Sequence, residues 1–246
     1  MLESFLDSGL YLVVDASALA LLVFCAYKRS WKRLAAPWTY LLAFLLIDAV
    51  ARRYFLYRYG ISSGQYYYCY WLTDVALALG AFLMVCTFFH RACAQDAKMW
   101  RFLRLFLVFV FLLVLGITLL SLSRNIDKVY SRLIIDFQQN LYFSGLVLNT
   151  LLYIMMQQIE TADDELNMLV CGMGLQFAGP AATFALRILT TPDNEFTKSL
   201  MVFLGPLCTL GMLLTWFYAV VKMPKPATAR ASRKLVPVMA TSRRAA

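Results

Sequence analysis

Four charged residues interrupt two strongly apolar segments in the first third of the chain. Asp48, Arg52 and Arg53 lie in one segment, and Asp74 lies in the next. An ionised side chain in hydrocarbon costs roughly 2.5–3.5 kcal/mol on insertion scales, so such groups face a bundle interior and pair with one another. Asp48 and Arg52 have the i, i+4 spacing that places an acid and a base on one helix face. We therefore expect a buried cluster of charges.

Arg52 and Asp74 are expected at the same depth in a membrane. If Trp38 marks the inner edge of its segment, Arg52 lies roughly 21 Å above that edge. Asp74 lies roughly 10 Å below the outer edge of a hydrocarbon layer about 30 Å thick. Polar residues of other segments fall in the outer half or near the midplane: Asp15, Gln138, Gln139, Asn140, Asn149 and Gln176. Together these residues predict a polar cavity open toward the outside.

Three interpretations of this cavity are open. In the first, it binds a small polar or anionic ligand, with Arg52 or Arg53 as the partner of an anion, through these residues: Asp48, Arg52, Arg53, Asp74, Gln139, Asn140 and Gln176. In the second, Asp48, Arg52 and Asp74 form a closed structural network, and Arg53 extends to the outer headgroups. The third is a proton relay through Asp48, which would need a matching carboxylate on a facing helix.

Catalytic and metal-binding motifs have little support. Cys86, His90 and Cys93 share one helix face, but they supply at most three ligands for a metal ion. A single histidine excludes bis-histidine haem ligation. The sequence has no Gly-rich phosphate loop and no HExxH, GxSxG or CxxC motif. We expect no catalytic residues, no metal and no cofactor, and hence no enzyme.

The composition predicts a membrane protein. The chain is 61% hydrophobic and only 15% charged, which lies outside the range of ordinary soluble domains. Seven apolar segments are long enough to cross the hydrocarbon layer: residues 9–27, 38–57, 67–89, 102–122, 137–157, 166–189 and 199–221. None alternates like a barrel strand, and the connections are short. We expect an all-α, seven-helix transmembrane bundle whose neighbouring helices are antiparallel.

The distribution of basic residues predicts the orientation. The side that holds residues 28–33, residues 91–104 and the C-terminal tail has about twice as many Lys and Arg residues as the other. We therefore expect the N-terminus outside and the C-terminus inside, in a bacterial inner membrane. The net charge of +9 lies in loops and tail rather than on a soluble face, so we expect no nucleic-acid partner.

Three parts of the chain follow from this topology. Residues 1–8 form a short extracytoplasmic N-terminus, residues 9–221 form the transmembrane domain, and residues 222–246 form a disordered basic cytoplasmic tail bound to anionic lipid headgroups. One inner loop contains no Lys or Arg but four acidic residues, which make it a candidate docking site for a basic cytoplasmic protein: Glu160, Asp163, Asp164 and Glu165.

The last two segments are rich in glycine and proline. Small residues allow close approach of helices: Gly172, Gly174 and Gly179 in one segment, Gly205 and Gly211 in the other. Pro180 and Pro206 each free a backbone carbonyl and bend a helix. The two prolines are therefore candidate hinges, although Gly and Pro are also generally common in membrane helices.

An aromatic-rich stretch opens the third segment. Its sequence, YYYCYWLTDVALALGAFL at residues 66–83, resembles that of uncharacterised bacterial seven-helix membrane proteins. The layout of the whole chain is similar to the membrane sensor half of bacterial seven-helix histidine kinases. Rhodopsins and G-protein-coupled receptors are set aside, because the last segment has no internal lysine and the Asp-Arg-Tyr and Asn-Pro-x-x-Tyr signatures are missing.

This resemblance implies a sensory or small-ligand-binding protein. No kinase or cyclase domain follows the last segment, so we expect its output to pass to a separate partner. Two other functions are open. A small-solute transporter or exchanger would use the intramembrane charges along its path. A non-catalytic accessory subunit of a membrane complex would use them only for assembly.

Overall fold

The computed structural model describes seven stretches of the chain: residues 2–28, 34–60, 63–94, 97–123, 129–158, 163–189 and 195–222. Almost every residue in these stretches is helical, and none forms a strand. The all-α prediction is confirmed. Residues 223–246, nearly all of the predicted tail, and Glu160 of the acidic loop lie outside the described residues.

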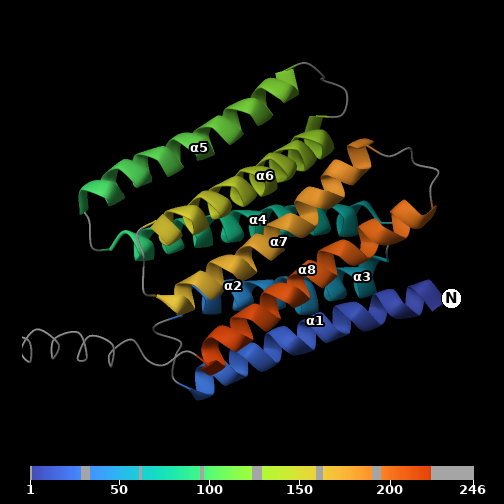
Figure 1. Cartoon of the computed structure of the whole chain (residues 1–246). Helices are drawn as coiled ribbons and strands as arrows, with labels where there is room; N and C mark the ends of the chain where they lie inside the picture. The colour runs from blue at the N-terminus through green and yellow to red at the C-terminus, as the bar shows by residue number, and fades with distance from the viewer. Residues whose placement is uncertain are drawn as a thin grey trace, which may run out of the picture.

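Seven helical rods make up the described structure (Figure 1). The second rod is continuous through three elements. The rods are α1 (Leu2–Tyr27), α2 (Ala35–Leu45) with η2 (Leu46–Arg52) and α3 (Arg53–Tyr59), α4 (Gly64–Ala92), α5 (Ala97–Ser123), α6 (Val129–Gln158), α7 (Asp164–Leu189) and α8 (Glu195–Lys222). Successive rods run in alternating directions (Figure 1), as the short connections predicted.

The helices extend beyond the apolar segments because polar residues cap them. Ser63 precedes α4, and its hydroxyl accepts a hydrogen bond from the Tyr66 amide at 3.1 Å. Asp163 precedes α7 in the same way, and its Oδ1 accepts from the Leu166 amide at 3.2 Å. Hydropathy detects only the part of a helix that needs to be apolar. The segments predicted from hydropathy therefore begin a few residues after the actual helix starts.

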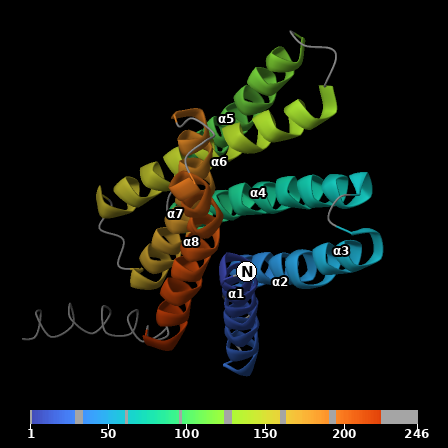
Figure 2. The same ribbon diagram turned by 90° about the vertical axis from the view of Figure 1, so that its right-hand side faces the viewer.

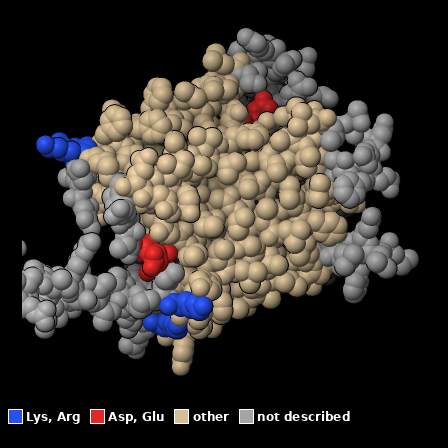
Figure 3. All heavy atoms as spheres, in the orientation of Figure 1, with Lys and Arg blue, Asp and Glu red and all other residues tan. Residues whose placement is uncertain are grey.

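Six of the seven rods are long and apolar enough to cross a membrane; the exception is α6. Six amides make α6 more polar than the others: Gln138, Gln139, Asn140, Asn149, Gln157 and Gln158. Since α6 packs against α4, α5 and α7, it can carry polar side chains with little exposure. The face seen in Figure 3 agrees with a membrane location, because a broad band without charge separates charged residues at its two ends.

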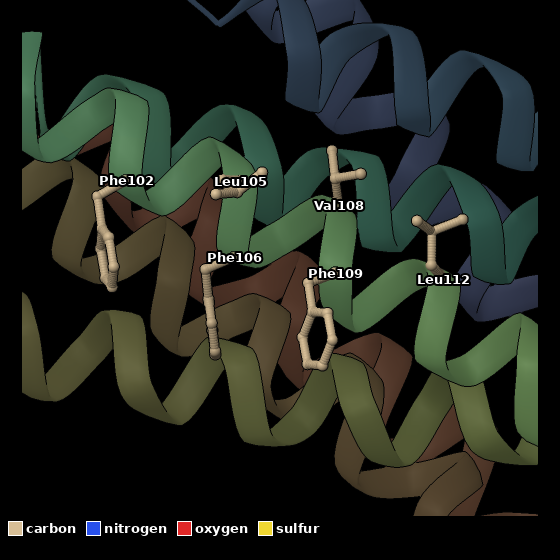
Figure 4. A pocket seen from close by; sticks show the side chains of 6 residues that line it. All are labelled: Phe102, Leu105, Phe106, Val108, Phe109 and Leu112. Carbon is tan, nitrogen blue, oxygen red and sulfur yellow. The ribbon is translucent and has the colours of Figure 1, made fainter.

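The rods α1 and α5 lie at opposite edges of the bundle (Figures 1 and 2). The span in α5 is only 17% buried, the smallest share among the six. One exposed face of α5 forms a shallow apolar groove (Figure 4), lined by Phe102, Leu105, Phe106, Val108, Phe109 and Leu112. A helix that presents large apolar side chains outward suits a lipid environment.

Helices α7 and α8 form the most extensive helix pair. A side-chain carbon added at Gly172 would lie 2.5 Å from Thr215 Oγ1 and 2.6 Å from the Trp216 ring. The Trp216 side chain is only 1% exposed, and its Nε1 donates to the Leu169 carbonyl at 3.0 Å. At Gly179 the added carbon would lie 2.9 Å from Cys208 Cβ. The predicted close approach is confirmed at these two glycines; the hinge role of the prolines stays a prediction.

Candidate functional site

A π-helical turn positions the charged residues of the second rod. The segment η2 covers Leu46–Arg52 and so includes both Asp48 and Arg52. Such turns are rare and are found frequently at functional sites. Neighbouring residues on a helix point in different directions, so Arg52 and Arg53 reach different helices. Hydrophobic periodicity gives no signal for a π turn, and the sequence predicted an uninterrupted α-helix here.

Arg52 is the centre of a network that joins η2 to α4. Its Nη1 donates to Asp48 Oδ1 at 3.0 Å, and its Nη2 donates to Asp74 Oδ1 at 2.8 Å. Its Nε donates to Thr73 Oγ1 at 3.2 Å, and its guanidinium lies 4.3 Å from the centre of the Tyr70 ring. Charge-assisted hydrogen bonds of this kind are among the stronger ones in proteins. The predicted pairing of Arg52 with both aspartates is confirmed.

The network continues from α4 into α6 through an amide. Gln138 Nε2 donates to Asp74 Oδ2, the carboxylate oxygen that Arg52 does not occupy. The same amide contacts the phenol of Tyr142, which is itself buried. The other amide atom, Gln138 Oε1, is buried and has no hydrogen-bond partner among the described residues.

Arg53 pairs with a carboxylate of α1. Its Nη2 donates to Asp15 Oδ2, a pairing that the sequence did not predict. The Arg53 side chain is 47% exposed, whereas Asp15 as a residue is only 8% exposed. The physical reason is that buried Asp15 requires a positive partner, and Arg53 is long enough to supply it while staying partly exposed. Asp15 Oδ1 is buried and has no hydrogen-bond partner within the described stretches.

We call six of these residues the charge cluster: Asp15, Asp48, Arg52, Arg53, Asp74 and Gln138. Three other predicted site residues lie elsewhere. Asn140 donates to Thr118 of α5 at 3.4 Å. Gln176 of α7 contacts the buried phenol of Tyr40 in α2. Gln139 is partly buried and forms no hydrogen bond with another described side chain. The polar residues are therefore divided among several contacts, and the common cavity stays a prediction.

Several members of the network were not selected from the sequence. Tyr70 and Thr73 support the guanidinium of Arg52, and the Thr73 hydroxyl also reaches the Cys69 carbonyl at 2.8 Å. Tyr70 precedes Asp74 by one helical turn, and this spacing could have identified it. Tyr40 and Tyr142 have no such signal, because only the packing of α2, α6 and α7 brings them next to the amides.

A second ion pair lies at the opposite end of α4. Arg91 Nη2 donates to Asp163 Oδ2 at 2.9 Å and to Glu165 Oε2 at 3.5 Å. Arg91 Nε also donates to Asp163 Oδ2, at 3.1 Å. The Glu165 side chain is only 4% exposed. Two of the four acids in the predicted docking loop are thus engaged by the chain itself, which reduces the negative charge left for a basic partner.

Cys86, His90 and Cys93 lie near this same end of α4. The His90 ring packs against Trp100 with ring centres 4.6 Å apart, and Cys93 is buried. Within the described ranges, no three His, Cys, Asp or Glu side chains lie close enough together to hold a metal ion.

The charge cluster places acids, bases, an amide and phenols in contact inside an apolar bundle. This arrangement can hold a charged or strongly polar species, or a proton. No protein-family model, no curated protein and no solved structure matches the chain. The site's own geometry therefore carries the functional argument.

Proposed function

We propose that this chain is a sensory-type membrane protein that recognises a small polar ligand at the charge cluster. All seven rods cross the membrane, with the N-terminus outside and the C-terminus inside a bacterial inner membrane. One observation carries the proposal: three carboxylates and two guanidiniums from α1, the second rod and α4 meet within an apolar bundle, where Asp15 Oδ1 is buried and has no hydrogen-bond partner among the described residues. Ionisable groups in membrane spans are costly and mark functional sites by default.

Helix α4 offers a route from this site to the inner side. Asp74 and Arg91 lie on the same helix, roughly 25 Å apart along its axis. A ligand that changes the contacts of Asp74 would move α4 relative to its neighbours, and Arg91 would transmit the movement to Asp163 and Glu165 at the start of α7. Pro180 and Pro206 are the hinges of this proposal. The ligand must bind one arrangement better than the other.

The proposed topology is tested by labelling single cysteines with a membrane-impermeant maleimide. In a chain without its six native cysteines, Ser63→Cys should react in intact cells. Ala94→Cys and Gln158→Cys should react only after permeabilisation. Reaction of Gln158→Cys in intact cells would show that α6 does not cross the membrane. The reverse pattern at Ser63 and Ala94 would invert the orientation.

Ligand recognition is tested by the melting temperature of the purified protein against a panel of small neutral, anionic and cationic compounds. A ligand that binds the folded state raises the melting temperature by mass action. The rise should vanish in Arg52→Ala and Asp74→Ala, and it should persist in the matched control Arg58→Ala, which alters an exposed arginine of the same rod. No rise with any compound would contradict a binding site.

A non-catalytic accessory subunit is the second candidate, because one observation favours it. Three nitrogens of Arg52 already donate to acceptors of the chain itself, as expected of a structural network. Copurification of a stoichiometric partner, together with a large loss of stability in Arg52→Ala and no ligand response, would support this function.

A further inference from the structure

The charge cluster contains more negative than positive charge. Three carboxylates, Asp15, Asp48 and Asp74, face two guanidiniums, Arg52 and Arg53. With all five groups ionised, the cluster carries one negative charge. Asp15 and Asp48 also act on each other electrostatically, although they belong to different rods. An uncompensated charge inside an apolar bundle is strongly unfavourable, so the cluster gains stability from one additional positive charge.

The unpartnered atoms of the cluster also favour an additional positive charge. Asp15 Oδ1 and Gln138 Oε1 are both buried without a hydrogen-bond partner among the described residues, and both are acceptors. The two residues are only 8% and 3% exposed. A buried acceptor without a partner costs free energy that a proton donor or a cation would recover. Charge and hydrogen bonding therefore favour the same kind of species.

We propose that the charge cluster binds one monovalent cation, a proton or an alkali-metal ion, at Asp15 and Asp48. The inference rests on the proposed function and names the class of its ligand. A divalent metal ion fits less well, because the three carboxylates exceed the two guanidiniums by one negative charge only, and a second positive charge would stay uncompensated. An anion fits less well because it would have to displace carboxylates from Arg52 or Arg53.

The charged and titratable groups around this site come from several elements. Any of them affects a titration of the cluster, so the test compares variants rather than relying on one pH profile. They are Tyr11 and Asp15 of α1, Tyr40, Asp48, Arg52 and Arg53 of the second rod, Tyr70 and Asp74 of α4, and Tyr142 of α6.

The experiment measures the melting temperature of the purified full-length chain in two series. The first replaces N-methylglucamine chloride by sodium, potassium or lithium chloride at constant ionic strength and pH. The second lowers the pH in N-methylglucamine chloride alone. At ten times the dissociation constant, the cation should raise the melting temperature by about 3 °C or more. A response to an alkali ion identifies the metal ion, and a response to pH alone identifies the proton.

Two variants make the test specific. Asp15→Asn and Asp48→Asn each remove the excess negative charge, so the response should disappear in both, and either suffices if the other does not fold. Asp164→Asn, an exposed acid at the other end of the bundle, should keep it. The proposal would be overturned if the melting temperature of the wild type did not respond. It would also be overturned if both cluster variants responded as strongly as the wild type.

Failure of this inference is distinguishable from failure of the proposed function. If neutral or anionic compounds raise the melting temperature and cations do not, the cluster binds a ligand of another class. If no compound, cation or proton has an effect, both proposals fail.

Discussion

The charge cluster and the contact between α7 and α8 hold the bundle together in different ways. In the cluster, opposite charges of α1, the second rod and α4 compensate one another, and two buried acceptor atoms have no hydrogen-bond partner in the part of the chain that the structure describes. In the α7–α8 contact, Gly172 and Gly179 let the helices approach until Thr215, Trp216 and Cys208 fill the space. The stability of the first region depends on charge compensation, and that of the second depends on side-chain volume.

This difference is the reason for placing the proposed function at the charge cluster. A contact fixed by shape serves the fold. A region with excess charge and unpartnered atoms is not optimised for stability alone, and such departures from local consistency are expected at functional sites. Substitutions that change charge without volume, or volume without charge, should therefore affect the two regions unequally.

The largest effect is expected for Arg52→Ala. The substitution leaves Asp48 and Asp74 without their shared positive partner, and breaking a buried ion pair in this way destabilises by about 3–5 kcal/mol. The free energy of unfolding in mixed micelles measures the loss. Arg58→Ala on the same rod is the control and should change stability by less than about 0.5 kcal/mol. A small loss in Arg52→Ala would show that the cluster does not depend on charge compensation.

The volume-dependent contact should respond to Gly172→Ala with a loss of about 1–3 kcal/mol. The added methyl group overlaps Thr215 and Trp216, which must move. Gly116→Ala of α5 is the matched control, since an added carbon there meets nothing within 4 Å. That control should be neutral or gain up to about 1 kcal/mol, because alanine favours a helix more than glycine does. Equal behaviour of the two variants would contradict the close packing of α7 on α8.

Arg91→Ala should have a smaller effect than Arg52→Ala, although both arginines contact two acids. The Arg91 and Asp163 side chains are 28% and 32% exposed, so water replaces part of the lost contact. Removal of the Arg91 guanidinium still leaves the negative charge of Glu165 less well compensated, and this side chain is only 4% exposed. We therefore expect the free energy of unfolding to fall by about 1–2 kcal/mol. If α4 transmits a signal, this variant should keep ligand binding measured by melting temperature.

The smallest effect is expected for Lys222→Ala at the end of α8. Its ammonium lies 3.3 Å from the Tyr218 hydroxyl, but the pair is exposed. Exposed contacts of this type contribute about 0–1 kcal/mol and weaken with salt. A change in melting temperature below about 2 °C is the expected result. A larger change would mean that charge matters outside the cluster as well.

Much of this architecture could be predicted from the sequence, because lipid imposes simple rules. Apolar segments of sufficient length predicted the helices, and the position of Asp48, Arg52 and Asp74 within them predicted an ion-pair network. Glycine spacing predicted the close contact at Gly172. These features depend on local composition or on one helix face.

The remaining features depend on how the rods are packed. Nothing in the sequence pairs Arg53 with Asp15 rather than with headgroups, since the two residues lie 38 positions apart. The same holds for the contact of Gln176 with Tyr40. The π turn at Leu46–Arg52 is a property of backbone hydrogen bonding that hydropathy does not report. When a side chain can reach several neighbours, only the three-dimensional arrangement shows which of them it contacts.

Charge compensation in the cluster is tested most directly by a double-mutant cycle between Arg52 and Asp74. Unfolding free energies of the wild type, Arg52→Ala, Asp74→Ala and the double variant give the coupling between the two residues. If the cluster is held by charge compensation, removing both partners should cost less than the sum of the single losses, with a coupling of at least about 1 kcal/mol. Losses that add within about 0.5 kcal/mol would show that the two residues act independently and would contradict the account.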